Sequence, residues 1–256
     1  MDLQSIYDEN YYNNYNTGLG PIAYDRSNPH WLWFFGNIAD KILKDLKPKS
    51  ILDVGCAKGF LVESFRDRGG EAFGIDISEY AINEVRQDIK KYCKVSPANE
   101  KFDSWYDLIT CIEVLEHLTE QDSQKAIENI CKSTDDVIFS STPDDFSEKT
   151  HINVQPLSYW IDSFARHGFY LDTYNCSFII DHAMRFRKMN HSIAIYNFRT
   201  TVKEKDTLIN ILKSELIKSK TEIKELQDAL DKILMAYSKS QQDILNLRLF
   251  LENNEK

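Results

Sequence analysis

The sequence predicts an α/β fold, a doubly wound and mostly parallel sheet, followed by a long C-terminal coiled-coil helix. Three observations predict it. Short β-rich runs alternate with helical stretches as far as about residue 200, which is typical of parallel sheets. All nine glycines lie at or before Gly168 and all six prolines at or before Pro156, so the last 88 residues contain no helix breaker. A heptad repeat of apolar residues occupies most of that last part.

Four β-rich runs are expected to form the interior of the sheet. They are Ser50–Val54, Glu71–Asp76, Tyr106–Ile112 and Asp136–Ser141. Helices are expected at about 60–68, from the N-cap Ser78 to about Lys91, at about 119–132 and at about 157–166. Two later runs, Phe169–Tyr174 and Ser192–Phe198, are expected to close the sheet.

The C-terminal part carries the pattern of a coiled coil. Apolar residues recur every seven positions from Ile209 to Leu251, and a second series three positions later runs from Leu212 to Leu247. Eleven of these thirteen positions are apolar and two are serine. Opposite charges support a parallel pairing, Glu215 with Lys220 and Asp243 with Arg248. We expect a homo-oligomer, a dimer or trimer, through residues 201–256; the alternative is a helix folded back onto the preceding domain.

The composition indicates a folded, acidic chain. Its 256 residues are 42% hydrophobic, which suffices for one sizeable core and is too much for a disordered chain. Forty acidic and 31 basic residues give a formal charge of −9, and residues 201–256 hold ten of each sign. The charge excess therefore belongs to the front part. Because an acidic domain is poorly suited to neutralise phosphates, we expect no nucleic-acid partner.

The cysteines and the first residues point to a reducing compartment. The five cysteines are widely spaced without a Cys-x-x-Cys pair, so we expect neither a zinc ribbon nor a disulfide framework. Residues 1–10 lack the basic and apolar pattern of a signal peptide. The strongest aromatic run, Trp31–Phe35, is too short to span a membrane. We expect a cytoplasmic chain without a membrane span.

A glycine-containing turn follows the first strand, at the edge where such sheets bind ligands. It reads Asp53-Val-Gly55-Cys-Ala57-Lys-Gly59, and Asp76 ends the second strand 17 residues later. Glycine permits close backbone approach, and the carboxylate of Asp76 can accept both hydroxyls of a ribose. A dinucleotide fingerprint wants glycines at 55, 57 and 60, of which the chain has only the first. The pattern favours a nucleoside ligand without a pyrophosphate.

This turn and two further stretches resemble class I S-adenosylmethionine-dependent methyltransferases. The stretches are Gly74-Ile-Asp76-Ile-Ser78 and Tyr106-Asp-Leu-Ile…Ile112-Glu113-Val-Leu-Glu116-His117. Ser141-Thr-Pro-Asp-Asp145 and His151-Ile-Asn153 are similar to methyltransferases of bacterial surface-glycan gene clusters, some of them fused to glycosyltransferases. The resemblance covers about residues 11–187 and implies a Rossmann-like domain at 46–200. An N-terminal cap or lid segment, 1–45, would precede it and the coiled-coil helix, 201–256, would follow.

The resemblance implies S-adenosylmethionine as cofactor, with S-adenosylhomocysteine as product. Asp53 would orient the turn or contact the methionine amine, directly or through water. Asp76 would hold the ribose hydroxyls and Ile77 would pack on the adenine. The backbone of the first turn would approach the methionine and ribose, and Ile112 and Glu113 would line the sulfonium side. The implied cofactor-binding residues are Asp53, Gly55, Cys56, Ala57, Gly59, Asp76, Ile77, Ile112 and Glu113.

An alcohol acceptor benefits from a base at the carboxyl edge of the sheet. His151 is the first candidate, because imidazole titrates near neutral pH, and Glu113 and His117 are the others. The alternative for both histidines is a structural role in their loops. Asp144 and Asp145 can either bind a divalent metal that polarises an acceptor diol or cap a helix. We assign no residue as a metal ligand.

Two other groups of residues bear on the acceptor. Tyrosines crowd the segment before the first long helix, either as a lid that stacks on sugar faces or as a packed cap: Tyr7, Tyr11, Tyr12, Tyr15 and Tyr24. Three basic residues can grip a phosphate or form a solvated helix face: Arg185, Arg187 and Lys188.

The sequence therefore predicts an S-adenosylmethionine-dependent O-methyltransferase of surface-polysaccharide biosynthesis. Its acceptor would be a hydroxyl of a sugar, nucleotide-sugar or glycan. One alternative keeps the fold and methylates a small metabolite, an amine or a protein. The other is an inactive methyltransferase domain that serves as a coiled-coil scaffold.

Overall fold

The computed structural model describes residues 6–13 and 23–254, and the chain divides into two compact units, residues 1–198 and 199–256. The strands are β1 (Ser50–Val54), β2 (Glu71–Asp76), β3 (Cys93–Val95), β4 (Leu108–Ile112), β5 (Asp136–Ser140), β6 (Phe169–Leu171) and β7 (Met184–Lys188). The helices of the first unit are α1 (Glu9–Asn13), α2 (Pro29–Asp45), α3 (Phe60–Asp67), α4 (Glu79–Asn83), α5 (Glu120–Ser133) and α6 (Leu157–Ala165). Single 3-10 turns are η2 (Lys90–Tyr92) and η3 (Leu115–His117). Helix α7 (His191–Asn254) begins in the first unit, and its residues from 199 on form the described part of the second.

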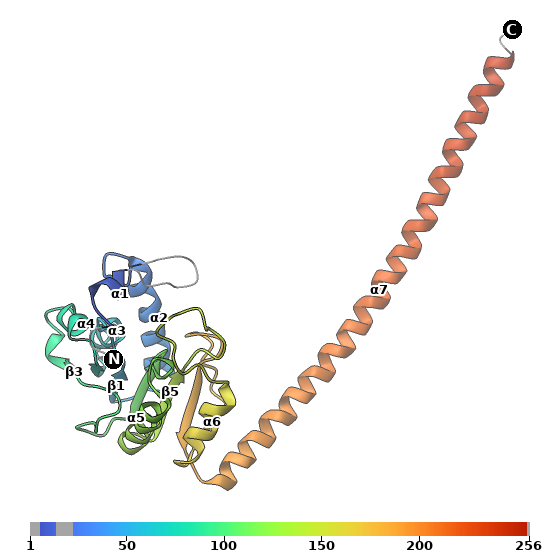
Figure 1. Cartoon of the computed structure of the whole chain (residues 1–256). Helices are drawn as coiled ribbons and strands as arrows, with labels where there is room; N and C mark the ends of the chain where they lie inside the picture. The colour runs from blue at the N-terminus through green and yellow to red at the C-terminus, as the bar shows by residue number, and fades with distance from the viewer. Residues whose placement is uncertain (1–5, 14–22, 255–256) are drawn as a thin grey trace. The chain divides into compact units, whose positions relative to one another are not determined.

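The strands form one seven-stranded sheet in the order β3-β2-β1-β4-β5-β7-β6 (Figure 1). The first five strands in this order, β3, β2, β1, β4 and β5, are parallel to one another, whereas β7 runs antiparallel to both β5 and β6. The order reverses between β1 and β4, and sheets of this kind bind ligands at the carboxyl ends of the strands at such a reversal. The predicted doubly wound, mostly parallel sheet is confirmed.

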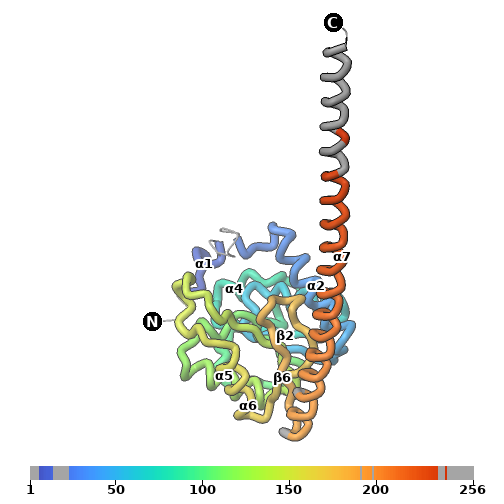
Figure 2. The backbone as a smooth tube through the Cα atoms, turned by 90° about the vertical axis from the view of Figure 1, so that its right-hand side faces the viewer, coloured from blue at the N-terminus to red at the C-terminus, as the bar shows by residue number. Residues whose placement is uncertain are grey.

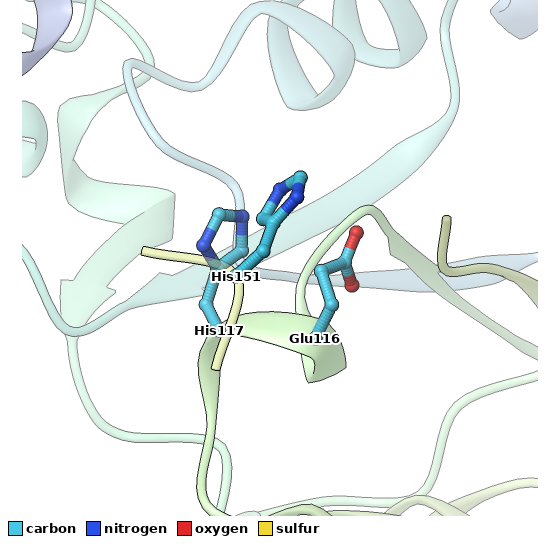
Figure 3. A group of neighbouring side chains, drawn as sticks. All are labelled: Glu116, His117 and His151. Atoms are coloured by element: carbon cyan, nitrogen blue, oxygen red, sulfur yellow. The ribbon is translucent and has the colours of Figure 1, made fainter. Parts of the chain in front are cut away.

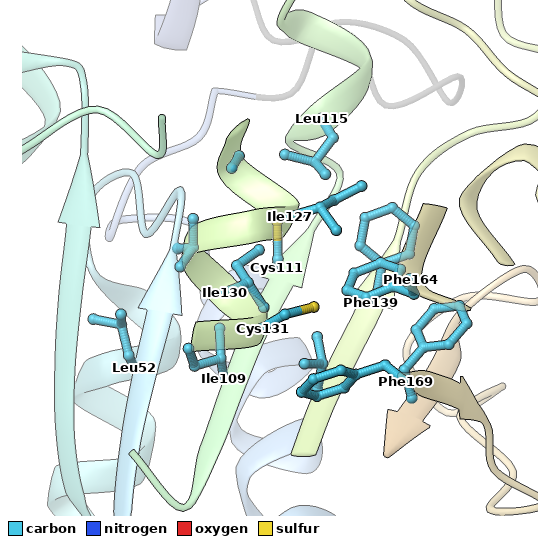
Figure 4. Close-up of a cluster of buried hydrophobic side chains, with 14 of the residues drawn as sticks. Leu52, Ile109, Cys111, Leu115, Ile127, Ile130, Cys131, Phe139, Phe164 and Phe169 are labelled. Atoms are coloured by element: carbon cyan, nitrogen blue, oxygen red, sulfur yellow. The ribbon is translucent and has the colours of Figure 1, made fainter. Parts of the chain in front are cut away.

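Side chains alternate between the two faces of the central strands, and each face has its own core. In β1, Ile51 packs with α2 and α3 on one face, and Leu52 packs with α5 and α6 on the other. Figure 4 shows the second face, where the rings of Phe139 in β5 and Phe164 in α6 are 5.3 Å apart. Burying each such side chain stabilises the fold by about 1.5–3 kcal/mol. The four β-rich runs predicted for the interior of the sheet therefore contain the interior strands β2, β1, β4 and β5.

The predicted helix over residues 78–91 is too long. Ser78 is the N-cap, as predicted, because its side chain accepts the capping hydrogen bond, but α4 ends at Asn83. Beyond it the guanidinium of Arg86 forms an ion pair with Glu63 of α3 at 2.8 Å. This tertiary contact holds the following residues in turns that lead to β3, a strand that the sequence analysis did not predict.

The last predicted strand is misplaced. Residues 192–198 are helical and belong to α7, and Met184–Lys188 closes the sheet instead. In β7, Met184 and Phe186 are buried, while the side chain of Arg185 between them is 11% exposed. Arg185 forms ion pairs with Asp136 and Asp172. These partners compensate the charge, and local sequence does not reveal them.

The three basic residues at positions 185–188 lie on this strand and not on a helix. Besides the pairs of Arg185, Arg187 lies 3.7 Å from Asp172 and Lys188 lies 3.4 Å from Asp135. The prediction of a helix face is wrong, and acidic neighbours oppose the binding of a phosphate to these side chains.

The described residues before α2 pack within the first unit, close to α3. Tyr12, Tyr24 and Trp31 form an aromatic cluster with Phe60 of α3. An ion pair between Arg26 and Glu63 adds a polar contact to the same helix. Tyr12 and Tyr24 therefore belong to a packed cap, the alternative that the sequence analysis left open for the tyrosines. Tyr15 lies outside the described residues.

Helix α7 differs from this packed cap in the exposure of its side chains. Every described side chain from 202 to 235 is exposed, including the heptad residues of that part. Figure 2 traces the backbone of this helix. Those apolar heptad side chains are between 46% exposed, at Ile209, and 70% exposed, at Leu226. No helix in the described part of the chain combines the length and apolar character needed to cross a bilayer.

Candidate active site

The turn after β1 has the conformation that its glycines predict. Gly55 and Gly59 have φ angles of +77° and +73°. A Cβ atom on Gly55 would lie 2.3 Å from Cγ2 of Val114, so only glycine fits there. Ala57 also has a positive φ, +46°, although it carries a side chain. This turn therefore lies directly against the segment that follows β4.

Asp76 ties this turn to the end of β2. Its Oδ2 accepts a hydrogen bond from the backbone N–H of Ala57 and its Oδ1 from that of Ser78, each at 2.8 Å. Each carboxylate oxygen has more than one acceptor position, so both can still accept a hydroxyl. Burial raises the pKa of Asp76 above its ordinary value. A ligand that donates to this buried carboxylate favours its ionised form.

Asp53 is a second buried acid close to the turn. Its Oδ1 accepts a hydrogen bond from the hydroxyl of Thr110 at 2.6 Å. Burial, assisted by the charge of Asp76, raises the pKa of Asp53 to about 7. A cation beside Asp53 would lower that pKa again, so the site suits a positively charged group such as an amine.

The segment after β4 begins with a strained residue, Glu113, which has a φ of +53°. Its N–H donates to the carbonyl of Ser140 at 3.1 Å, and its Oε1 lies 2.9 Å from Nε2 of His182. Burial alone would raise the pKa of Glu113, but the hydrogen bonds from His182 and Ser140 bring it below its ordinary value. The same bond raises the pKa of His182. The sequence analysis did not single out His182.

Glu116 is fully buried in the same segment. Its backbone carbonyl accepts a hydrogen bond from Asn153 N–H at 2.9 Å, which holds the loop after β5 beside η3. Its Oε2 has no hydrogen-bond partner among the described residues. Burial and the charge of Glu113 raise the pKa of Glu116 well above its ordinary value.

His117 and His151 meet between these two loops, with ring centroids 4.7 Å apart (Figure 3). Nδ1 of His117 lies 3.0 Å from the hydroxyl of Thr150, and Nδ1 of His151 lies 2.8 Å from the carbonyl oxygen of Asp145. Burial lowers the pKa of His117 to about 4, so this imidazole is neutral at pH 7. Two of the three predicted candidates for a base, His117 and His151, therefore lie together. The third, Glu113, pairs with His182 instead.

Two tyrosines of the N-terminal segment reach these loops. The ring of Tyr7 lies 5.8 Å from that of His117, edge to face, and the hydroxyl of Tyr11 donates to Glu148 at 3.0 Å. The carbonyl of Tyr7 also accepts a hydrogen bond from Ser78. Tyr7 and Tyr11 therefore cover part of the site, and Ala57 of the turn packs against the cluster that contains Tyr12 and Tyr24.

The other predicted residues lie as follows. Ile77 follows Asp76 and Ile112 ends β4, and both are half-buried. The side chain of Cys56 is buried in the core, so only its backbone lies in the turn. Asp144 is exposed. Asp145 accepts hydrogen bonds from Ser147 in a turn of the loop, which is not a helix cap.

The fold and this site define an α/β domain of the methyltransferase class. The chain matches the methyltransferase-domain family over residues 33–175, and it belongs to that family. This confirms the methyltransferase resemblance in its general form. The domain is an S-adenosylmethionine-dependent methyltransferase domain, and the acids and turn described above fit that cofactor.

Solved structures and curated relatives agree with this class. Magnesium protoporphyrin IX methyltransferase from Synechocystis, solved with bound SAH, is similar with a TM-score of 0.55 at 14% identity. That likeness covers 72% of this chain and 96% of the other. Ubiquinone biosynthesis O-methyltransferases from Nitrosomonas europaea and Acinetobacter baylyi are 33% identical over 115 residues and 31% over 133.

Those two matches cover 41% and 48% of this chain, and 48% and 52% of the relatives. The chain thus spans about half the length of the curated relatives it matches. These relatives do not show the predicted similarity to glycan-cluster enzymes, because they are named ubiquinone biosynthesis O-methyltransferases.

Proposed function

We propose that the protein is an O-methyltransferase that methylates a hydroxyl of a sugar, nucleotide-sugar or glycan. One observation carries the proposal: His117, on the segment that packs against the turn after β1 through Val114, meets His151 of the loop after β5. Together with Glu116, Glu148 and Thr150 these two histidines form a polar cluster. When bound, S-adenosylmethionine supplies an activated methyl group. The chain then has to bind the cofactor, align the acceptor and handle one proton.

The cofactor-binding residues keep the roles that the resemblance implies. Asp53 binds the methionine amine, and Asp76 binds the ribose hydroxyls with acceptor positions that the turn leaves free. Ile77 packs on the adenine. The backbone of Gly55, Cys56, Ala57 and Gly59 forms the floor under the methionine and ribose. Ile112 and Glu113 line the sulfonium side, where a carboxylate favours the positive charge.

The acceptor hydroxyl is handled by the histidine pair. The carbonyl of Asp145 can only accept, so Nδ1 of His151 carries the hydrogen and its Nε2 carries a lone pair. As a base, His151 would take the hydroxyl proton on Nε2 while the oxygen bonds to the methyl carbon. Tyr7 and Tyr11 suit a sugar, because tyrosine offers a ring face and a hydroxyl.

A second candidate acceptor is a hydroxyl of a small metabolite. The names of the curated relatives favour it, since those proteins are O-methyltransferases of ubiquinone biosynthesis. Release of S-adenosylhomocysteine from panels of nucleotide-sugars, glycans and catechols separates the two candidates. Turnover with the sugars supports the proposal, and turnover with catechols alone overturns its choice of acceptor.

The role of His151 is tested on the acceptor found in this way. His151→Ala should lower turnover about 100-fold or more while the dissociation constant of S-adenosylmethionine changes less than about twofold. The matched control is His167→Ala, an exposed histidine after α6. Loss of turnover together with cofactor binding in His151→Ala would show a structural histidine.

We further propose that α7 pairs with the same helix of a second copy as a parallel coiled coil. The exposed apolar series from Ile209 to Ile233 and the opposite charges of Glu215 and Lys220 support this pairing. A helix with such a stripe is stable when another helix covers it.

A further inference from the structure

Three side chains in the polar cluster offer the atoms that bind divalent metals. Glu116 and His117 come from η3, and His151 comes from the loop after β5 (Figure 3). One donor atom of each lies within 4.8 Å of the others. Such proximity is common without a metal, so the hydrogen bonds around the three side chains decide what they can bind.

The hydrogen bonds of Thr150 determine which nitrogen of His117 is free. The hydroxyl of Thr150 donates its one proton to the carboxylate of Glu148 at 2.6 Å. Toward Nδ1 of His117, 3.0 Å away, the same hydroxyl can only accept. Nδ1 of His117 therefore carries the hydrogen, and Nε2 presents a lone pair.

His151 has the same arrangement, because its Nδ1–H donates to the carbonyl oxygen of Asp145. Its Nε2 lies 3.4 Å from Oε2 of Glu148, so a lone pair faces a carboxylate. These two acceptors repel each other unless a proton or a cation stands between them. A histidine that donates its other N–H to a backbone carbonyl is the usual form of a metal ligand.

Glu116 supplies an independent observation. Its side chain is fully buried, and its Oε2 has no hydrogen-bond partner among the described residues. A buried carboxylate oxygen without a donor is unfavourable unless a proton, a cation or an ordered water satisfies it.

We propose that Glu116, His117 and His151 bind a divalent transition-metal ion through one carboxylate oxygen and two Nε2 atoms. Two imidazoles and one carboxylate suit ions such as Mn²⁺, Fe²⁺, Co²⁺ and Zn²⁺, whereas Mg²⁺ and Ca²⁺ prefer oxygen ligands throughout. Three protein ligands leave positions open for an acceptor oxygen, as in catalytic metal sites.

This inference rests on the proposed function for its chemistry and gives His151 another task there, as a ligand instead of a base. The metal would bind the acceptor hydroxyl and lower its pKa. The hydroxyl proton passes to the carboxylate of Glu148, and the oxygen forms its bond to the methyl carbon. The bond from that carbon to sulfur breaks, and its electron pair stays on sulfur.

The test is metal binding by the full-length chain without cofactor or acceptor. After treatment with a chelator, MnCl₂ is titrated in, and the free ion is followed by electron paramagnetic resonance, with ZnCl₂ and MgCl₂ as competitors. We expect one Mn²⁺ per chain, displaced by Zn²⁺ and not by equal Mg²⁺. His117→Ala and His151→Ala should each weaken Mn²⁺ binding about 100-fold, and Glu116→Gln about tenfold or more.

Two further variants keep the test decisive. Thr150→Val removes the hydroxyl that orients His117 and should weaken Mn²⁺ binding about tenfold. If a histidine variant fails to fold, Thr150→Val still tests the proposal, because an unchanged affinity of Thr150→Val for Mn²⁺ contradicts it. Asp144→Asn is the control and should bind Mn²⁺ like the unaltered chain. A loss in Asp144→Asn equal to that in His151→Ala would assign the metal to the acidic pair instead.

Cofactor titrations separate this inference from the proposed function. A chain that binds S-adenosylmethionine but neither Mn²⁺ nor Zn²⁺ below about 1 mM contradicts the metal site alone. A chain that binds metal but no S-adenosylmethionine contradicts the proposed function and leaves the metal site standing.

Discussion

The two units of the chain treat apolar residues in opposite ways. In the first unit, consecutive residues such as Ile51 and Leu52 are buried on opposite faces of one sheet, and both cores are filled from the same chain. In the second, every described side chain from 202 to 235 is exposed, whatever its chemistry. The first unit is thus complete within one chain. In the second, the apolar series of residues 202–235 is not covered by its own chain, and its stability depends on what covers it.

The largest effect is expected from a charge in the exposed apolar stripe. Leu216→Asp places an unpaired carboxylate from each copy in the interface between helices, at a cost of about 4 kcal/mol or more. The dissociation constant of the oligomer should rise about 1000-fold. Sedimentation equilibrium measures it, and the dissociation constant of S-adenosylmethionine should stay within about twofold.

Ile217→Asp is the matched control, since Ile217 is the next residue, is 67% exposed and lies outside the heptad core positions. It should leave the oligomer intact. A full-length chain that sediments as a monomer without any substitution contradicts the coiled coil. Equal dissociation by both substitutions would mean that another face of α7 forms the interface.

A smaller effect, on cofactor affinity and not on the oligomeric state, is expected from substitution of Asp76. Asp76→Ala removes the carboxylate that is proposed to accept hydrogen bonds from the ribose and should weaken S-adenosylmethionine binding about tenfold to a hundredfold, while the oligomeric state is unchanged. Calorimetric titration measures the affinity. Asp103→Ala, an exposed aspartate of the same unit, is the control. An unchanged dissociation constant in Asp76→Ala would remove Asp76 from the site.

The interior strands and the cofactor turn could be predicted because local sequence determines them. Val54 ends a short run that is rich in aliphatic residues, and Gly55 occupies a position where a Cβ atom does not fit. Ser78 caps its helix with its own side chain. Each of these features depends on residues close together in the chain, where patterns of residue type are informative.

The features that were missed depend on distant partners. β7 contains Arg185, which is compatible with an interior strand only because Asp136 and Asp172 neutralise it. Missing that strand also hid His182. Because β7 is antiparallel, the residues just before it lie at the carboxyl edge of β5, next to Glu113. A correct assignment of Met184–Lys188 would have placed His182 at the site.

The smallest predicted effect concerns Asp53 and the pH dependence of the first unit. The pKa of Asp53 is about 7 in the folded chain and near its ordinary 3.8 when unfolded. Between these values the folded chain holds a proton that the unfolded chain has released. The stabilisation is therefore fully present below about pH 4 and is lost as the pH rises through about 7. Because asparagine does not ionise, Asp53→Asn does not lose this stabilisation as the pH rises.

Asp53→Asn should be more stable than the unaltered chain by about 2 kcal/mol at pH 8, with a much smaller difference at pH 5. Urea unfolding of cofactor-free protein at the two pH values measures this. Cofactor binding should respond in the opposite direction, because the ionised Asp53 is proposed to attract the methionine amine. The unaltered chain should bind S-adenosylmethionine more tightly at pH 8 than at pH 6. At pH 8, Asp53→Asn should bind S-adenosylmethionine about tenfold more weakly than the unaltered chain does. A variant with unchanged stability at pH 8 would show that Asp53 ionises without strain. The acid of the first turn would then contribute to binding without lowering the stability of the fold that carries it.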